Sequence, residues 1–600
     1  MQPHTNVGHL SHIVLVLAAM VMAAMALGGR LLTGDEQRTY AQTTSRPNIV
    51  FVMSDDLDER SMEDLDSLSQ LMGGTNGTTF QNAYVTDPLC CPSRATILRG
   101  QYPHNHTILG NIPKEGGGEQ KFRDLGLDQS TVATWLKGAG YRTSYIGKYM
   151  NGYGDGELYI PPGWDEWFVL NGRPHLPYVN DNGQSVTITG NSTDVFAAEA
   201  SDFILRSSEN PEPFFAVVGT HAPHTPPAVA ERHKGAFADT PLPQPLNFDE
   251  EDVLDKPQWL QQYPRLSQQQ IDELEQLYRE RLRSMLAVED LLERIIATLD
   301  QTGELSNTYI FFTSDNGFHF GNHRLYPAKK ETPYEEDIGV PLMVRGPGVP
   351  AGEVRKELVL NNDFAPTIAE LAGASTPVFV DGRSFAPLLT GSTPYSSRSA
   401  FLAEGWWLTE PLRPPLAPTY KGVHTQKYML VEYVDTGEHE LYDLVADPYQ
   451  LESLRQSDNP QLYSTLQSRL DALRACSGAV CRANEWGTKV ISTVPEANAT
   501  AVAPTAKVNG TFSEDMLASS ITRQTFKLLE KGTTTKIAAT VTYQPSTHTA
   551  TLDPTNSLKS GVTYKAVVTT GATDLAGNPL DQNTTKTGLQ QKAWFFTVSP

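Results

Sequence analysis

The chain has 600 residues, with 47 Lys and Arg against 69 Asp and Glu, and so carries a formal net charge of −22. Its length predicts several domains with ample material for a core, and its acidic balance argues against a nucleic-acid partner. A charged fraction of 19% with 9% aromatic residues excludes global disorder, and an anionic substrate would need locally placed cations.

The N-terminus carries an uncharged, mostly apolar run over residues 13–29. This run is short for a membrane span but has the length of a signal-peptide core. We therefore expect a signal peptide over residues 1–41, with Thr39-Tyr40-Ala41 as the cleavage site and a retained signal anchor as the alternative. In both cases the remaining chain is exported, and is either secreted or held at the cell surface.

Only four cysteines occur, which excludes a disulfide-rich scaffold. Cys476 and Cys481 form a close pair in an exported chain, which suits one small disulfide-bonded loop. Cys90 and Cys91 are adjacent, and a disulfide between neighbours is strained and uncommon. This second pair therefore needs another explanation.

From Pro47 onward, strand and helix patterns alternate. Short continuous apolar runs predict strands buried on both faces, and the clearest helix begins after the N-cap Ser267, has Gln270 in the capping-box position and ends at Gly303. The alternation predicts an α/β domain with a mainly parallel sheet over residues 46–395. The expected strands are Ile49–Met53, Arg142–Ile146, Phe214–Val218 and Tyr309–Thr313, with another helix over Thr131–Lys137.

The pattern changes twice towards the C-terminus. Residues 396–482 predict a smaller α+β subdomain with antiparallel strands at Lys427–Val434 and Glu440–Leu444 and a helix at Leu462–Ala475. Residues 493–600 show short alternating segments separated by turn residues, which predicts an all-β sandwich. The expected strands of the sandwich are Lys507–Phe512, Ala538–Tyr543, Ala550–Leu552, Val562–Thr569 and Trp594–Val598.

Oxygen-bearing side chains follow two of the predicted strands. Asp55 and Asp56 come after the first strand, and Asp315 and Asn316 come after the strand at Tyr309–Thr313. Each pair alone suits a solvated turn or a helix cap, but ligands bind at the carboxyl ends of strands in parallel sheets. Together the two pairs predict a hard divalent cation, Ca²⁺ or Mg²⁺ rather than Zn²⁺.

Cys90-Cys91-Pro92-Ser93-Arg94, with Gly100 six residues further on, resembles the C-x-P-S-R signature of type I sulfatases. The resemblance implies an alkaline-phosphatase-like sulfatase core and oxidation of Cys90 to formylglycine by a formylglycine-generating enzyme. The hydrate of this aldehyde would attack the sulfate ester. A buried free thiol is the alternative for Cys90.

Other segments extend the resemblance over residues 46–482 and imply roles for further residues. Lys148 matches the lysine that contacts sulfate, His224 the active-site histidine, and Lys330 the second catalytic lysine, so Lys148 and Lys330 would join Arg94 in supplying positive charge. The resemblance favours Ca²⁺ over Mg²⁺, held by Asp55, Asp56, Cys90 as formylglycine, Asp315 and Asn316. The similarity is closest to the branch of the N-acetylglucosamine-6-sulfatases and heparan endosulfatases.

Two further features bear on the resemblance. Met150 stands where many sulfatases have a histidine that regenerates formylglycine, so His319 and His323 become candidates for that base or for substrate contacts. Thr511–Met516 and Asp574–Asn578 resemble bacterial immunoglobulin-like domains, which implies a spacer or a module that contacts cell wall or glycan.

The sequence thus predicts a sulfuric ester hydrolase. Its substrate would be a sulfated glycan, with 6-O-sulfated N-acetylglucosamine as one possibility, or a small aryl sulfate. His224 with Lys330 would protonate the leaving oxygen. The alternatives are a phosphoester or phosphonate hydrolase of the same superfamily and an inactive, exported glycan-binding protein.

Overall fold

The computed structural model describes residues 46–600 apart from 155–156, 173–177, 391–397, 407–416, 486–487, 514–515, 576–577 and 583–588. The predicted leader, residues 1–41, lies outside the described residues. Among the helices that are described, none combines the length and the apolar character needed to cross a membrane.

A ten-stranded sheet forms the centre of the large domain, in the order β11-β2-β10-β9-β1-β8-β4-β5-β6-β7. The strands that position the site are β1 (Asn48–Ser54), β4 (Arg142–Gly147), β8 (Phe214–Gly219) and β9 (Thr308–Ser314). The outer strands are β2 (Thr78–Phe80), β5 (Glu166–Leu170), β6 (Tyr178–Asp181), β7 (Gln184–Thr187), β10 (Leu342–Arg345) and β11 (Glu353–Arg355).

The four central strands are parallel, and all seven residues of β1 are buried. In register, Met53 lies opposite both Gly219 and Thr313, and Ser54 lies opposite Ser314. The carboxyl ends of β1, β8 and β9 therefore meet at one edge of the sheet. β10 pairs antiparallel with β9, and β6 pairs antiparallel with β5, so the sheet as a whole is mixed.

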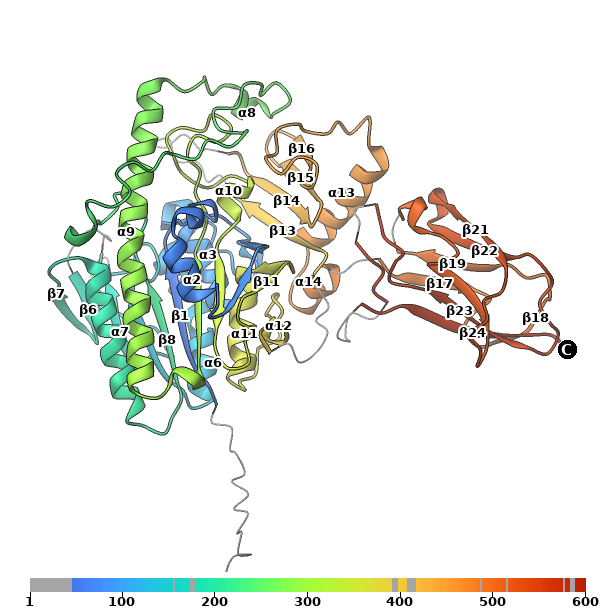
Figure 1. Ribbon diagram of the computed structural model, residues 1–600, viewed down its shortest axis with the longest axis horizontal. Coiled ribbons are helices and arrows are strands. Elements are labelled where there is room, and N and C mark those ends of the chain that lie inside the picture. Colours follow the sequence, from blue (N-terminus) through green and yellow to red (C-terminus); the bar gives the residue numbers. More distant parts are fainter. Residues whose placement is uncertain are drawn as a thin grey trace, which may run out of the picture. The chain divides into compact units, whose positions relative to one another are not determined.

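Helices cover both faces of the sheet (Figure 1). Val50 and Val52 point into a core shared with α7 (Ser192–Ser208) and α9 (Gln268–Gln301), whereas Phe51 and Met53 face a core shared with the other helices. On that second face lie α3 (Cys90–Arg99), α6 (Val132–Gly138) and α11 (Phe364–Leu371). The predicted capping box of Ser267 and Gln270 at the start of α9 is confirmed.

A second sheet of four antiparallel strands has its own apolar core and lies under α13 (Pro460–Arg474). The predicted disulfide between Cys476 and Cys481 is present, whereas Cys90 and Cys91 are free and buried. The strands are β13 (Ala400–Gly405), β14 (Tyr420–Thr425), β15 (Tyr428–Tyr433) and β16 (Glu438–Asp443).

The C-terminal segment forms two four-stranded sheets around a separate apolar core that includes Phe512, Trp594 and Phe596. One sheet holds β17 (Val490–Val494), β19 (Val508–Phe512), β21 (Ala539–Gln544) and β22 (Thr549–Pro554). The other holds β18 (Ala499–Val502), β20 (Phe526–Glu530), β23 (Thr563–Val568) and β24 (Lys592–Val598). The five strands predicted there are confirmed, whereas β17, β18 and β20 were not predicted.

Shorter elements complete the chain. They are α2 (Asp66–Met72), β3 (Ala83–Tyr84), α4 (Pro103–His106), α5 (Gly118–Asp124), α8 (Gln258–Gln261), α10 (Glu335–Ile338), β12 (Val359–Leu360), α12 (Ala386–Thr390) and α14 (Ala479–Asn484).

Candidate active site

The carboxyl ends of β1 and β9 bring the two predicted oxygen-bearing pairs together. The backbone N–H of Asp56 donates to Asp315 Oδ1 at 3.0 Å, and Asn316 Nδ2 donates to Asp56 Oδ1 at 2.9 Å. Asp56 has a φ of 68°, a left-handed conformation that is uncommon for a residue with a side chain. Such strain is sustained because surrounding contacts fix the backbone, and it is typical of functional sites.

Cys90 begins α3 and faces these carboxylates. Leu89 before it is extended, so the chain turns abruptly into the helix and holds the Cys90 side chain over the strand ends. Its Sγ lies 3.5 Å from Asp55 Oδ1, 3.8 Å from Asp56 Oδ1 and 2.7 Å from Lys330 Nζ. The thiol is fully buried.

Arg94 lies one helical turn after Cys90 and points to the same cluster. Its Nε donates to Asp315 Oδ2 at 2.7 Å, and its Nη1 donates to the carbonyls of Lys148 at 2.7 Å and Tyr149 at 3.1 Å. Nη2 lies 4.0 Å from Asp55 Oδ1 and is buried with no hydrogen-bond partner among the described residues. Arg94 therefore joins α3 to the ends of β4 and β9.

The two predicted lysines are ion-paired with the strand-end carboxylates. Lys148, directly after β4, contacts Asp55, and Lys330, in the loop after β9, contacts Asp56. Both lysines are buried. Three acidic side chains, Asp55, Asp56 and Asp315, are thus balanced by three basic ones, Arg94, Lys148 and Lys330.

His224 lies in the loop after β8, with Nε2 at 3.8 Å from Asp56 Oδ2. The ring of His221, which no motif had singled out, lies 4.8 Å from the His224 ring between centroids. Burial lowers the pKa of His224, although Asp55 and Asp56 oppose this, and lowers the pKa of His221 to about 3. Both imidazoles are therefore neutral near pH 7.

The cluster also shifts the pKa of its acids. Burial would raise the pKa of Asp55, but Lys148, His224 and Arg94 together hold it well below the usual range. Burial, with Asp55 nearby, raises the pKa of Asp315 to about 6 against the effect of Arg94. Burial also raises the pKa of the Cys90 thiol, although Lys148 and Lys330 oppose it. The unmodified thiol is therefore protonated and a weak nucleophile.

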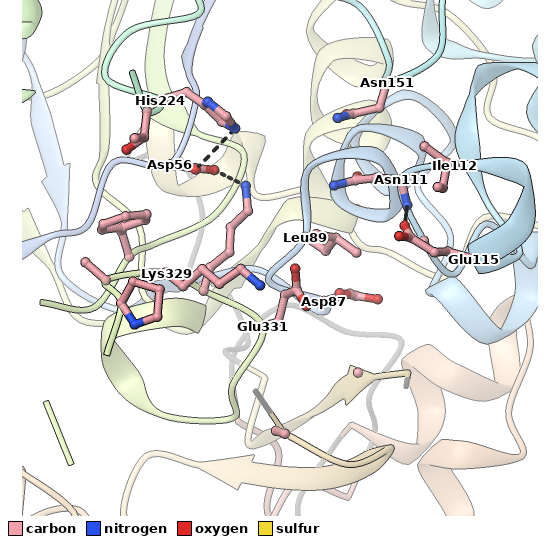
Figure 2. A pocket seen from close by; sticks show the side chains of 18 of the residues that line it. Asp56, Asp87, Leu89, Asn111, Ile112, Glu115, Asn151, His224, Lys329 and Glu331 are labelled. Carbon is pink, nitrogen blue, oxygen red and sulfur yellow. Dashed lines mark hydrogen bonds and ion pairs between the residues drawn. The ribbon is translucent and has the colours of Figure 1, made fainter. Parts of the chain in front are cut away.

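These groups open onto a cavity of about 830 Å³, which Asp56, Lys148, His221, His224 and Lys330 line. Figure 2 shows His224 and Asp56 at one end, with the side-chain amides of Asn111 and Asn151 facing the cavity from another side. The volume fits a small organic ligand such as a sugar unit.

The residues at the strand ends fit a divalent cation. Ligand atoms of Asp55, Asp56, Cys90 and His224 all lie within 4.8 Å of one another, and Asn316 Oδ1 is buried without a hydrogen-bond partner among the described residues. A buried amide oxygen without a partner is costly unless it serves another ligand. With Asp315 alongside, the donors are mostly oxygens, which suits a hard cation.

Three residues discussed from sequence lie elsewhere. Met150 is buried in the apolar core beneath the sheet. His319 Nδ1 hydrogen bonds Asp337 Oδ1 at 2.9 Å, and His323 Nδ1 hydrogen bonds Glu250 Oε2 at 2.6 Å. Neither histidine is among the residues that line the cavity. The expectation that they serve as base or substrate contact therefore has no support in this geometry, because both rings are held by buried carboxylates.

Arg281 is a site residue that sequence reasoning missed. It lies on α9 and donates to the carbonyls of Asp56 and, at 3.1 Å, Pro223, with its guanidinium 3.9 Å above the Phe318 ring. It thereby holds the strained Asp56 backbone. The sequence did contain a signal for Arg281. It is a charged residue at the helical spacing of the buried residues Tyr278 and Met285, which indicates a buried charge with a partner.

Comparison with known proteins agrees with this geometry. The sulfatase family model matches residues 47–374, the model of the N-sulphoglucosamine sulphohydrolase C-terminal region matches 321–476, and that of the bacterial Ig-like domain matches 486–598. The chain is 36% identical over 484 residues to N-acetylglucosamine-6-sulfatase of Capra hircus, covering 74% of this chain and 86% of the relative.

The chain belongs to the sulfatase family.

This sulfatase also resembles an arylsulfatase of Volvox carteri, at 33% identity over 78% of this chain and 80% of the relative. A solved structure in complex with its substrate D-glucosamine-2-N,6-O-disulfate matches with a TM-score of 0.61 at 26% identity, covering 73% of this chain and 99% of that one. The predicted alkaline-phosphatase-like sulfatase fold with a C-terminal Ig-like domain is confirmed, and the protein is a sulfuric ester hydrolase rather than a binding protein.

Proposed function

We propose that this sulfatase removes 6-O-sulfate from a glucosamine unit of a sulfated glycan. The observation that carries the proposal is the combination of a sugar-sized cavity, a complete set of buried acids and bases around Cys90, and the similarity to N-acetylglucosamine-6-sulfatase over most of both chains. The solved neighbour bound to a sulfated glucosamine supports the same substrate class.

Cys90 acts in its formylglycine form, made by a formylglycine-generating enzyme. One hydroxyl of the hydrated aldehyde would attack sulfur as the bond from sulfur to the sugar oxygen breaks, and the second hydroxyl would then expel sulfate and restore the aldehyde. Asp55, Asp56, Asp315 and Asn316, with the modified Cys90, hold the divalent ion. We favour Ca²⁺ over Mg²⁺. When bound, the ion supplies positive charge that polarises the sulfate.

The fixed cations of the chain then face the sulfate oxygens. Because Asp55, Asp56 and Asp315 are balanced by their ion-pair partners Arg94, Lys148 and Lys330, a bound dication would leave this cluster with a net positive charge. Arg94, Lys148 and Lys330 are already held in place by buried ion pairs and need no reorganisation when charge develops on the transferring group.

The leaving oxygen receives its proton at the other side of the cluster. Burial would lower the pKa of Lys330, but Asp56, Cys90 and Asp55 together raise it well above its usual range, so Lys330 remains charged. His224 lies against the same carboxylate and lines the cavity. Lys330 with His224 would therefore protonate the departing sugar oxygen as the ester bond breaks, the charged Lys330 supplying the proton and the neutral His224 hydrogen bonding to the same oxygen.

The apolar run over residues 13–29 supports export, and the C-terminal Ig-like domain supports contact with cell wall or glycan outside the cell. Both are part of the proposal.

Two measurements test the proposed function. Peptide mass spectrometry on protein from its native host should show formylglycine at position 90 and an alkylatable Cys91. The same protein should release sulfate from N-acetylglucosamine 6-sulfate, whereas Cys90→Ala should lose at least about 1,000-fold in kcat because no nucleophile remains. Sulfate release at the wild-type rate by Cys90→Ala would overturn the mechanism, and preference for a phosphate ester would overturn the substrate class.

A further inference from the structure

One oxygen of a buried carboxyl group at the wall of the substrate cavity has no hydrogen-bond partner among the described residues. Asp87 lies three residues before Cys90, is only 2% exposed and lines the cavity. Its Oδ2 has no hydrogen-bond partner among the residues that the structure describes. An unsatisfied buried acid destabilises a fold, so its presence at the wall of a binding cavity points to a ligand.

A second unpartnered group lines the same cavity. The hydroxyl of Tyr420, on β14, is buried and has no hydrogen-bond partner in the described part of the chain. Tyr420 lines the same cavity as Asp87, and burial together with the Asp87 carboxyl raises the pKa of Tyr420. Gly405 lies directly opposite Tyr420 in the strand pair and leaves room for its ring, which a Cβ there would meet at 2.3 Å.

The connection between β13 and the loop before α3 fixes this arrangement. The N–H of Glu404 donates to the carbonyl of Thr86 at 2.7 Å, which seats Asp87 beside β13. Glu404 itself is paired with His104 and with Lys421, at 3.0 Å. The negative charge of Glu404 is thus balanced by His104 and Lys421. As a carboxylate, Glu404 has no hydrogen to donate to Asp87.

Other charged groups at this end of the cavity leave Asp87 open to a ligand. Lys421 is directed to Glu404 and lies 3.5 Å from the centre of the Trp406 ring, which also lines the cavity. Lys329 and Glu331 line the cavity too, and Figure 2 shows the Asp87 and Glu331 carboxyl groups on the same side. No described ion pair joins Lys329 to Asp87. Burial, with Glu404 nearby, raises the pKa of Asp87 against the effect of Lys421.

We propose that Asp87 and Tyr420 select a carbohydrate as the leaving group, by binding a hydrogen-bond donor of the sugar ring, either a hydroxyl or an ammonium group. An aryl alcohol has no such donor and cannot use this contact. The inference rests on the proposed function, because it assigns the residues that distinguish a sugar sulfate from an aryl sulfate at the same site.

The experiment measures kcat/KM of the matured enzyme with N-acetylglucosamine 6-sulfate, glucosamine 6-sulfate and 4-nitrophenyl sulfate. Asp87→Ala should lower kcat/KM about 10- to 100-fold, on both sugars where the bound donor is a ring hydroxyl and on glucosamine 6-sulfate where it is the ammonium, because the donor then loses its buried acceptor. Hydrolysis of the aryl ester should change by less than about threefold, because that substrate does not make the contact. Tyr420→Phe should act in the same direction with a smaller loss.

Asp87→Asn distinguishes the two donors. The amide of Asp87→Asn keeps one acceptor oxygen. If the bound donor is a hydroxyl, kcat/KM of Asp87→Asn should therefore be higher than that of Asp87→Ala on both amino sugars. A bound ammonium predicts instead that Asp87→Ala and Asp87→Asn lower kcat/KM equally on glucosamine 6-sulfate and leave N-acetylglucosamine 6-sulfate unchanged, because its acetamide carries no ammonium. Asp381→Asn is the matched control, because Asp381 is a buried acid that accepts from the backbone N–H groups of Tyr102 and Gly478. It should lower stability without changing the ratio of sugar to aryl activity.

The outcomes separate the inference from the function on which it rests. A wild-type enzyme active on the sugars, with Asp87→Ala equally active on them or equally impaired on all three esters, overturns the inference and leaves the function standing. A wild-type enzyme that hydrolyses only the aryl ester overturns both. A lower thermal midpoint for Asp87→Asn together with equal losses on every substrate would assign Asp87 to the fold and also overturn the inference.

Discussion

Arg94 shows how much one side chain decides at this site. Its guanidinium reaches Asp315 on one strand end and the carbonyls of Lys148 and Tyr149 beyond another, so it fixes the relative positions of α3, β4 and β9. A planar group with several donors can satisfy these acceptors together, whereas an ammonium cannot. The residue therefore carries positive charge and also positions Lys148.

Arg94→Lys should lower kcat/KM at least about 100-fold, since lysine keeps the positive charge but loses the fixed guanidinium geometry next to the transferring group. It should also lower the free energy of unfolding by about 1 to 3 kcal/mol, because buried acceptors are left unsatisfied. Steady-state kinetics and denaturant titration measure the two effects.

Arg99→Lys is the matched control for this prediction. Arg99 lies on the same helix and donates to the carbonyls of Leu127 and Ser130, at 2.6 and 2.8 Å, outside the site. A similar loss of stability is expected, with kcat/KM changed by less than about threefold. Equal activity losses in both variants would mean that Arg94 acts only through the stability of α3.

At the scale of elements, strand ends and the tight turns after them position the catalytic groups. Lys148 follows Gly147, which has a φ of 94° at the end of β4, and the Lys148 N–H donates to the Gly219 carbonyl at 2.7 Å. A Cβ on Gly147 would lie 2.0 Å from that carbonyl oxygen. Only glycine allows β4 to turn this close to β8.

Gly147→Ala should therefore lower the free energy of unfolding by more than the left-handed backbone conformation alone would. Gly190 has a φ of 86° with open space where a Cβ would lie, so Gly190→Ala is the control. We expect a loss of about 1 kcal/mol at Gly190 and at least about 2 kcal/mol more at Gly147, where backbone must move. The Gly147 variant should also lose sulfatase activity, since Lys148 shifts. Equal unfolding free energies in the two variants would contradict the crowding argument.

If the oxygen donors at the ends of β1 and β9 hold the proposed ion, activity should depend on a divalent cation. Removing metal with a chelator should abolish sulfate release and lower the thermal midpoint, because ligand binding to the native state adds stability. Restoration by Ca²⁺ at lower concentration than by Mg²⁺ would support the proposed ion. Full activity after exhaustive chelation would contradict the assignment of Asp55, Asp56, Asp315 and Asn316 as ligands.

At the scale of the whole molecule, separate apolar cores divide the described chain into parts. The described residues from Val490 to Val598 form a core of their own, while the cavity is lined by residues up to Tyr420. The described lining of the cavity therefore includes no side chain of the C-terminal domain.

A chain that ends after residue 487 should hydrolyse N-acetylglucosamine 6-sulfate with kcat/KM within about threefold of the full chain, since domains with separate cores fold as units. Its binding to polysaccharide or cell wall, measured by co-sedimentation, should weaken if the Ig-like domain supplies that contact. The full chain treated in parallel is the control. A large loss of kcat in a folded truncated protein would show that the C-terminal domain supports the active site.

Patterns within the sequence predicted the parts of this protein that depend on local chemistry. The apolar run at Ile49–Met53 predicted a buried strand, Ser267 with Gln270 predicted the start of α9, and the residues around Cys90 predicted a sulfatase. These features lie within short segments, where periodicity, capping and motif spacing operate. The acids after β1 and β9 were also predictable, because parallel strands end at one edge.

Tertiary structure alone decided which distant groups meet. Arg281 reached the Asp56 backbone from a helix 225 residues further on, and His319 and His323 were held away from the cavity by Asp337 and Glu250. Asp87 and Tyr420 face one cavity because β13 hydrogen bonds the loop before α3. Such contacts depend on packing between elements far apart in the chain, whereas sequence patterns report only what each segment does locally.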